Sequence, residues 1–167
     1  MKKQRMEKTE RNIMKKSKEN TISLNRKAKF NYNIKEVYEA GIELKGNEVK
    51  SLRKHAVNLK DNYCVIQEGE IYVFNMHISA YDHGNIFNED PLRKRKLLMH
   101  KKQISMLYGF VQKKGFSIII LSLYFKKNII KAQLGLCQGK KIYDKRRDIA
   151  KKEIDRNIRR NLKQKYI

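Results

Sequence analysis

The sequence predicts a mainly β fold with minor helix, built as an antiparallel and partly closed barrel. Two hairpin patterns carry this prediction, one at Tyr63–Ile66 and Ile71–Ile78, the other at Phe116–Phe125 and Ile129–Leu136. A strand pattern precedes them, and one substantial helical pattern lies between them. A parallel α/β sheet needs alternating strands and helices, and this order of elements does not provide them.

The chain opens with a basic arm, residues 1–24, whose isolated apolar residues follow no sustained period. Ordered structure is expected to start near Asn25. From Tyr32 to Leu44 the apolar side chains fall mostly on alternate positions, which is the period of a half-buried strand. A glycine interrupts this strand, and residues 48–53 then predict a short helix with Asn47 as its N-cap.

The first hairpin is expected to turn in the polar loop Gln67–Glu70, and a long loop follows over residues 81–95. Helical spacing from Leu97 to Val111 predicts the main helix of the core, with Gly115 as its C-terminal stop. The second hairpin is β-branched and nearly all apolar, and it turns at Lys126–Asn128.

The tail, residues 139–167, holds no glycine or proline after its first residue, so a helix can form there. Its apolar stripe is narrow and its charges are mostly alike, which makes the helix marginal on its own in water. Two interpretations stay open: the tail folds on an RNA surface, or it packs as a helix on its own barrel. The stripe recurs every four residues at Ile154, Ile158, Leu162 and Tyr166.

The formal net charge of +23, from 40 Lys+Arg and 17 Asp+Glu, points to a polyanionic partner. The ends carry most of it: residues 1–29 hold 11 basic and 3 acidic residues, and the tail holds 12 and 4. A domain of modest charge with a basic segment at each end is typical of proteins that bind RNA, because such segments neutralise phosphates. A solvated lysine-rich surface is the alternative, since Lys outnumbers Arg 29 to 11.

Several classes of protein are excluded or disfavoured. The longest apolar runs are far shorter than the roughly 18–20 residues of a membrane-spanning helix, and no signal peptide follows the basic start. Two cysteines do not form the framework of a secreted disulfide-rich domain. Cys64 and Cys137 stand among apolar neighbours and are interpreted as buried packing residues.

No pattern argues for catalysis, a metal or a cofactor. The four histidines lack metal-ligand spacing, and no phosphate loop, nucleophile elbow or carboxylate cluster is present in the sequence. The pair Glu89 and Asp90 is interpreted as a partner for Arg93 or Arg95. What remains is a surface where cations and aromatic rings alternate, and this suits structured RNA with unpaired bases better than duplex DNA.

Short motifs in sequence order, from about Asn25 to the C-terminus, resemble the small protein B family, the SsrA-binding proteins of bacteria and some organelles. The motifs are Asn25-Arg26-Lys27-Ala28-Lys29, Tyr38-Glu39-Ala40-Gly41-Ile42, Gly46-Asn47-Glu48-Val49-Lys50-Ser51-Leu52-Arg53, Asn58-Leu59-Lys60-Asp61, Asp90-Pro91-Leu92-Arg93, Arg95-Lys96-Leu97-Leu98, Leu123-Tyr124-Phe125, and Gly139-Lys140-Lys141 with Asp144-Lys145-Arg146.

This resemblance implies a monomeric, non-enzymatic RNA chaperone of trans-translation, cytoplasmic in bacteria or in the equivalent stroma or matrix of an organelle. The family's fold is an oligonucleotide-binding-type β-barrel with embedded helices, here residues 25–138. Its members bind the tRNA-like domain of transfer-messenger RNA (tmRNA) and bring it to stalled ribosomes, where they stand in for the codon–anticodon helix. The tail, disordered when free, is expected to become helical in the empty mRNA channel.

Matching motifs carry the family's site residues onto this chain. Glu39 and Leu98 belong to the tmRNA face, as does His100, which replaces the asparagine of some members. Lys50 and Arg53 are added as basic candidates. Ribosomal RNA at the decoding centre is expected to meet Phe30, which stands where a histidine is usual, and the tail residues Gly139, Lys140, Lys141, Tyr143, Asp144, Lys145 and Arg146.

A second hypothesis is a ribosomal or general RNA-binding barrel that uses the same positive surface without selectivity for tmRNA. The two differ at Glu39, because removing an anion from a nonspecific cationic surface cannot weaken phosphate binding. An enzyme such as a nuclease is a distant third.

Overall fold

The computed structural model describes residues 20–82, 84, 88–112 and 115–165. Its strands are β1 Thr21–Leu24, β2 Tyr32–Ile42, β3 Val57–Asn58, β4 Tyr63–Gln67, β5 Glu70–Phe74, β6 His77–Ile78, β7 Arg95–Leu98, β8 Phe116–Lys126 and β9 Ile129–Gly139. All strand pairs are antiparallel. The prediction of a mainly β antiparallel fold with minor helix is confirmed.

The pairing of the strands forms a closed ring. Along the sheet the order is β8-β4-β5-β7-β2-β9, and β9 pairs back onto β8, with β1 added outside β8. The two long strands β8 and β9 form a hairpin along their whole length, and β2 runs beside β9 from Tyr32 to Gly41. The oligonucleotide-binding type of this sheet stays an expectation from the family resemblance.

Alternation of side chains along these strands explains the core. Every second residue of β5, Ile71 and Val73, is fully buried, as are Leu134 and Leu136 of β9, which are also two residues apart. Burial of both faces at the centre of β8 fits its nearly unbroken apolar run, because one face meets the main core and the other meets a second cluster around Ala28, Ile119, Leu121 and Cys137.

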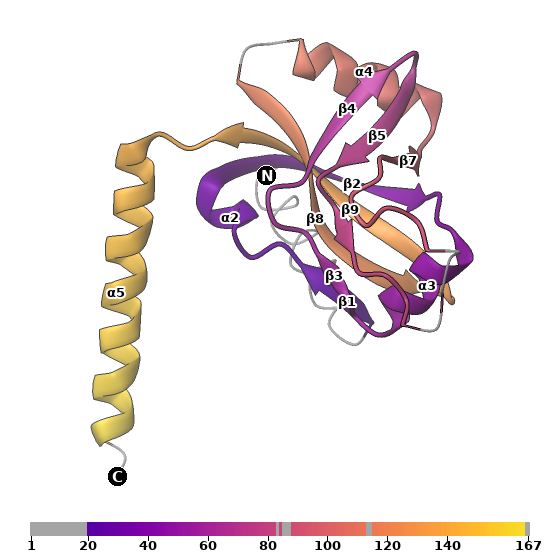
Figure 1. The fold of residues 1–167 in the computed structure, drawn as a ribbon. Coiled ribbons are helices and arrows are strands. Elements are labelled where there is room, and N and C mark those ends of the chain that lie inside the picture. The colour runs from indigo at the N-terminus through magenta and orange to yellow at the C-terminus, as the bar shows by residue number, and fades with distance from the viewer. Residues whose placement is uncertain (1–19, 83, 85–87, 113–114, 166–167) are drawn as a thin grey trace.

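The described residues also form helices, which are shown with the strands in Figure 1. They are α2 Ala28–Asn31, α3 Gly46–Arg53, α4 Lys101–Val111 and α5 Ile142–Lys165. α4 contacts β5 and β8 and buries Ile104 and Leu107, while α3 contacts β6 and buries Leu52. In Figure 1 these two helices lie at opposite ends of the strand assembly, and α5 projects away from it.

The tight turns follow the residue types. Lys127 and Asn128, between β8 and β9, both have positive φ (48° and 65°), as a two-residue hairpin turn with the favoured twist requires. Glu68 and Gly69 do the same between β4 and β5 (51° and 73°). Both turns lie where the sequence predicts them.

Some predicted boundaries are wrong. β1 pairs with β8, so ordered structure starts before Asn25 and the predicted end of the arm at residue 24 is too late. Residues 1–19 of that arm lie outside the described residues. Leu97 and Leu98 belong to β7 and not to the helix, because β5 and β2 both take β7 as a ladder partner. Gly139 pairs with Tyr32 at the end of β9, and the division of the chain into a domain over residues 25–138 and a tail stays a prediction.

Three further details of the prediction meet the structure. α3 begins at Gly46 with Lys45, not Asn47, as the residue before it. Cys64 and Cys137 are buried free thiols, as expected. No helix within the described residues is long and apolar enough to cross a membrane.

Candidate nucleic-acid interface

Glu39, Leu98 and His100, the three residues assigned to the tmRNA face by resemblance, come from neighbouring elements. β2 and β7 pair with Gly41 opposite Leu98 and Ile42 opposite Leu97. Directly opposite residues of an antiparallel pair point to the same face, and Glu39 is two residues from Gly41 on β2, so Glu39 and Leu98 are expected on one exposed face of the sheet. His100 follows two residues after Leu98, beyond the end of β7.

Gly41 makes this face flat. A Cβ atom at Gly41 would lie 3.2 Å from the Cβ of Leu98, so the absence of a side chain lets Leu98 lie close over the backbone of β2. The Leu98 side chain nevertheless stays 52% exposed. An exposed leucine beside a glycine floor is a surface on which a base or a ribose can pack.

The carboxylate of Glu39 is held by two residues of β8. Tyr124 donates its hydroxyl proton at 2.6 Å, and Lys126 Nζ lies 2.8 Å from Oε1 and 2.9 Å from Oε2. The hydrogen bond from Lys126, with that from Tyr124, holds the pKa of Glu39 below its usual range. Burial, reinforced by the hydrogen bond to Glu39, raises the pKa of Tyr124.

No sequence pattern assigned a role to Tyr124 or Lys126. β9 lies between β2 and β8, pairing Gln133 with Glu39 on one side and with Ser122 on the other. This pairing brings together residues that are 85 and 87 positions apart in sequence. Tyr124 was noted only as part of the family motif Leu123-Tyr124-Phe125, so the order of the motifs was the one signal that could have pointed to it.

His100 precedes α4 with extended backbone, and its side chain makes no capping hydrogen bond. The ring is exposed.

Lys50 and Arg53 lie on the exposed side of α3, an element separate from the strands that carry Glu39 and Leu98. The Lys50 Nζ lies 5.2 Å from the centre of the Tyr81 ring, and Lys54 Nζ lies 4.7 Å from the same centre. Lys54 also pairs with Asp82 at 3.2 Å. Sequence reasoning named Lys50 and Arg53 and missed Lys54 and Tyr81.

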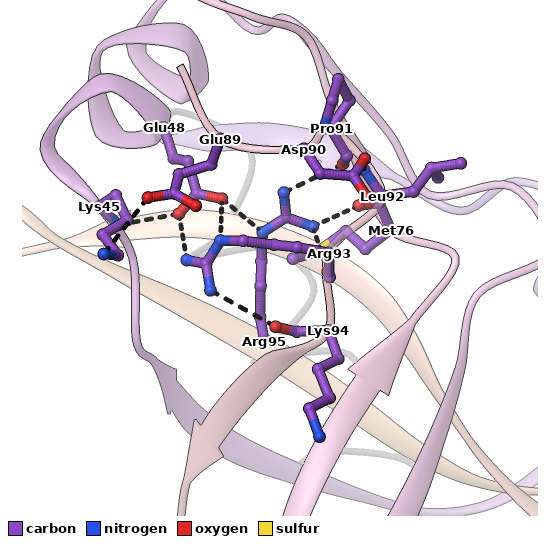
Figure 2. A network of polar contacts seen from close by, with 10 residues as sticks. All are labelled: Lys45, Glu48, Met76, Glu89, Asp90, Pro91, Leu92, Arg93, Lys94 and Arg95. Atoms are coloured by element: carbon purple, nitrogen blue, oxygen red, sulfur yellow. Dashed lines mark hydrogen bonds and ion pairs between the residues drawn. The ribbon is translucent and has the colours of Figure 1, made fainter. Parts of the chain in front are cut away.

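The buried side of α3 carries an ionic network centred on Glu48 (Figure 2). Arg93 binds both carboxylate oxygens, with Nε 2.9 Å from Oε1 and Nη2 2.6 Å from Oε2. Arg95 Nε donates to Oε1 at 2.8 Å, and the backbone N–H of Lys45 donates to Oε2 at 2.8 Å. All of these donors converge on a side chain that is only 6% exposed.

Arg95 spreads the network beyond α3. Its guanidinium is 1% exposed and also donates to the carbonyl oxygens of Met76, Pro91 and Arg93, at 2.6, 3.0 and 3.1 Å. Burial opposes ionisation of Glu48, but the hydrogen bonds from Arg93, Lys45 and Arg95 outweigh it and lower its pKa. For the deeper Arg95 burial dominates and lowers the pKa, whereas the more exposed Arg93 gains more from Glu48 and its pKa rises.

The prediction that Glu89 or Asp90 pairs with Arg93 or Arg95 is therefore wrong. Glu89 pairs with Lys45 at 3.3 Å, and the carboxylate of Asp90 accepts the backbone N–H of Leu92 at 2.9 Å. Proximity in sequence favoured these acids, but the partner of both arginines is Glu48, 45 and 47 positions away.

Four of the residues predicted to face the ribosome meet at the base of the tail. Gly139 ends β9 opposite Tyr32, and the next residue, Lys140, donates its backbone N–H to Asn31 at 3.0 Å. Lys140 Nζ reaches the carbonyl oxygen of Lys29 at 2.7 Å, and Lys145 Nζ lies 6.0 Å from the centre of the Phe30 ring. α2 therefore contacts the start of α5.

Lys141, Tyr143, Asp144 and Arg146 lie at or next to the first turn of α5. Tyr143 is 69% exposed, and the guanidinium of Arg147 lies 5.8 Å from the centre of its ring. Of the two interpretations of the tail, the structure shows a helix that does not pack on its own strands (Figure 1).

Within the described residues, no three His, Cys, Asp or Glu side chains come together as a metal site requires. The interface combines many cations and exposed rings with a few carboxylates, of which Glu39 and Asp82 are paired with lysines, and this composition suits RNA.

Comparison with known proteins finds relatives that match most of this chain. The model of the SmpB protein family matches residues 22–164. The SsrA-binding protein of Acetivibrio thermocellus is 48% identical over 153 residues, which cover 92% of this chain and 99% of that protein. The SsrA-binding protein of Alkaliphilus oremlandii is 52% identical over 144 residues, covering 86% and 93%. A solved structure described as "tmRNA-SmpB: a journey to the center of the bacterial ribosome" matches with a TM-score of 0.62 and 45% identity, over 72% of this chain and 85% of that chain.

Proposed function

This chain belongs to the SmpB family, and we propose that it is an SsrA-binding protein that binds tmRNA and acts with it on stalled ribosomes in trans-translation. The observation that carries the proposal is the match to an SsrA-binding protein over 92% of this chain and 99% of that protein. The charge of +23 supports it, because both tmRNA and ribosomal RNA are polyanions. The protein acts in the cytoplasm, or in the stroma or matrix of an organelle, as a monomer and without catalysing a reaction itself.

The tmRNA face is Glu39, Leu98 and His100, together with Tyr124 and Lys126. Leu98 offers apolar contact, and the Glu39 carboxylate, already oriented by two donors, accepts hydrogen bonds from a base or a 2′-hydroxyl. A carboxylate repels phosphates, so its place on a basic surface favours a particular RNA contact over a general one.

The ribosome side is Phe30 and the start of the tail. Phe30 and Tyr143 provide rings that can stack on unpaired bases of the decoding centre, and the surrounding cations bind phosphates. The tail helix then occupies the empty mRNA channel. Its cations at the C-terminal half, together with the helix that the structure forms there, support this role.

A gel shift with the isolated tRNA-like domain of tmRNA tests the proposal. The protein is expected to bind this RNA more tightly than an unrelated tRNA at physiological salt. Glu39→Ala is expected to weaken binding by about tenfold or more, since it removes a hydrogen bond to a charged group. Glu36→Ala, on the same strand and also exposed, is the matched control. Equal affinity for both RNAs contradicts the proposal.

The alternative, a general RNA-binding barrel, predicts that Glu39→Ala binds every RNA as well as or better than the parent, because a negative charge has been removed. Sustained cleavage of RNA by the pure protein would instead revive the nuclease hypothesis.

Truncation after Gly139 separates the two sides of the molecule. Affinity for the tRNA-like domain is expected to stay within about threefold of the full chain, because the strands and α3 are intact. Tagging of peptides on stalled ribosomes in a reconstituted translation system is expected to stop. Loss of RNA affinity on truncation would show that the division between residues 25–138 and the tail is wrong.

A further inference from the structure

The outer side of α3 gathers positive charge. Lys50, Arg53 and Lys54 are exposed and stand at spacings of three and four residues, so they share one face of the helix. The opposite face is buried through Glu48, Ser51 and Leu52. This division is what an amphipathic surface helix requires, and it leaves the cations facing solvent.

Among the described residues, an acidic partner neutralises only Lys54 of this face. Lys54 pairs with Asp82 at 3.2 Å, but Lys50 and Arg53 have no ion pair with any residue that the structure describes. Lys50 and Lys54 instead lie against the ring of Tyr81, at 5.2 and 4.7 Å from its centre. Two ammonium groups held at one ring repel each other, and an anion placed between them relieves that repulsion.

The backbone beneath these cations is rigidly supported. Glu48 binds the side chains of Arg93 and Arg95, and Arg95 in turn binds carbonyl oxygens of the segment at Pro91 and of Met76 (Figure 2). Ile78, next to the loop that carries Tyr81, also donates its N–H to Pro91 at 3.1 Å. The helix and the strand that precedes Tyr81 are therefore tied to the same buried network, which holds the backbone of α3 close to that segment.

We propose that the face formed by Lys50, Arg53 and Lys54, with the Tyr81 ring beside the two lysines, binds the phosphate backbone of RNA without reading its bases. This proposal rests on the proposed function, because the RNA that it names is the tRNA-like domain of tmRNA. Base readout needs a free ring for stacking or paired donors and acceptors. Here two ammonium groups lie within 5.2 Å of the centre of the ring, and all three cations carry donors without an acceptor, which suits phosphate oxygens. The α3 face supplies affinity, whereas the face around Glu39 supplies selectivity.

Salt dependence of binding tests this division. The double variant Lys50→Gln/Arg53→Gln removes two cations while keeping helix-compatible side chains. With the value for B-DNA, each lost phosphate contact reduces the steepness of the plot of log K against log salt by about 0.9. Two lost contacts then make the affinity deficit about 12-fold larger at 50 mM than at 200 mM salt. The matched control removes two exposed lysines on other elements, Lys35→Gln/Lys60→Gln.

The experiment measures both variants on the tRNA-like domain and on an unrelated hairpin RNA. The expected result is a slope lowered by about two on both RNAs for the α3 variant, and by less than one for the control. An unchanged slope, or an equal change in the control, overturns the proposal, as does a loss confined to the tRNA-like domain.

Tyr81→Leu separates phosphate contact from stacking. It is expected to change affinity by less than about fivefold, while a larger loss with an unchanged slope would show a stacked base and overturn the proposal. If the parent itself fails to prefer the tRNA-like domain, the proposed function fails, but the slopes still decide the role of α3.

Discussion

Replacing Glu48 by glutamine removes the carboxylate charge on which Arg93 and Arg95 converge, with almost no change in volume. Glutamine keeps one acceptor oxygen, but its NH₂ group faces guanidinium donors and cannot accept from them. Arg95 is 1% exposed, so water cannot replace the lost partner. The variant therefore leaves a positive charge buried without its counter-ion.

The cost follows from that burial. Removing one partner of a buried ion pair destabilises a protein by about 3–5 kcal/mol, because the remaining charge stays uncompensated. Arg93 is 21% exposed and can turn to solvent, so most of the loss comes from Arg95. With a denaturant slope of about 2 kcal/mol per molar, the urea midpoint is expected to fall by about 1.5–2.5 M.

Urea unfolding followed by the near-ultraviolet circular dichroism of the tyrosines measures this, because that signal reports packing of the strands and is less sensitive to α5. Glu89→Gln is the matched control: it makes the same change in the exposed pair with Lys45, where about 0–1 kcal/mol is at stake. A loss in Glu48→Gln no larger than in Glu89→Gln would refute the reasoning.

The pH dependence gives a second check on Glu48. Its folded-state pKa is lowered from the ordinary 4.5, so its contribution to stability is complete above that value and is lost as pH falls through the folded pKa. The stability difference between the parent and Glu48→Gln should therefore shrink on acidification below about pH 4.5. A difference that grows on acidification contradicts the network.

Three further predictions concern the interior. Asn62→Ala removes a buried amide that donates to the Leu59 and Ile120 carbonyls at 2.6 and 3.2 Å and accepts the Ile120 N–H at 2.7 Å. We expect the free energy of unfolding to fall by about 2–3 kcal/mol, which lowers the melting temperature by about 6–12 °C. A change under 2 °C would contradict this expectation. Gly135→Ala places a Cβ 2.9 Å from Leu121 Cδ1 and 3.0 Å from Cys137 Sγ, so we expect destabilisation by about 1–3 kcal/mol in urea, whereas unchanged stability would mean that Leu121 moves aside freely. Burial raises the pKa of the Cys137 thiol to about 12, and burial together with the nearby Cys137 raises the pKa of the Cys64 thiol. An aromatic disulfide reagent at pH 8 should therefore label neither thiol in the native protein and both thiols in urea. Rapid labelling of the native protein would place a thiol at the surface.

Local pattern was sufficient for much of the fold. Alternation predicted β2, the polar loop before Ile71 predicted the hairpin of β4 and β5, and the β-branched apolar runs predicted β8 and β9. The hairpin turns at Gly69 and Asn128 were placed correctly, because period, composition and turn chemistry are properties of neighbouring residues. β7 was missed for the same reason. Its four residues show no period long enough to separate strand from helix, and the ladder partners that define it lie in β2 and β5.

The residues of the candidate site also fall into those that the sequence predicted and those that only the structure revealed. Motif order named Glu39, Leu98 and the residues at the base of the tail, and the structure places Glu39 and Leu98 on paired strands. It did not find Tyr124 and Lys126 as the partners of Glu39, or Glu48 as the partner of both arginines. These contacts join residues 45 to 87 positions apart, and only the closure of the strands brings them together.

The amount and placement of positive charge, the strand-rich class and the motifs of the family were determined by the sequence alone, since each is a property of composition or of short segments. Tertiary structure decided which cations are neutralised and which remain available to RNA. Arg93 and Arg95 are bound to Glu48 inside the fold, whereas Lys50 and Arg53 face solvent without an acid among the described residues. A charge count cannot make that distinction, because the energy of a charge depends on its burial and its partners, and both are set by residues distant in sequence.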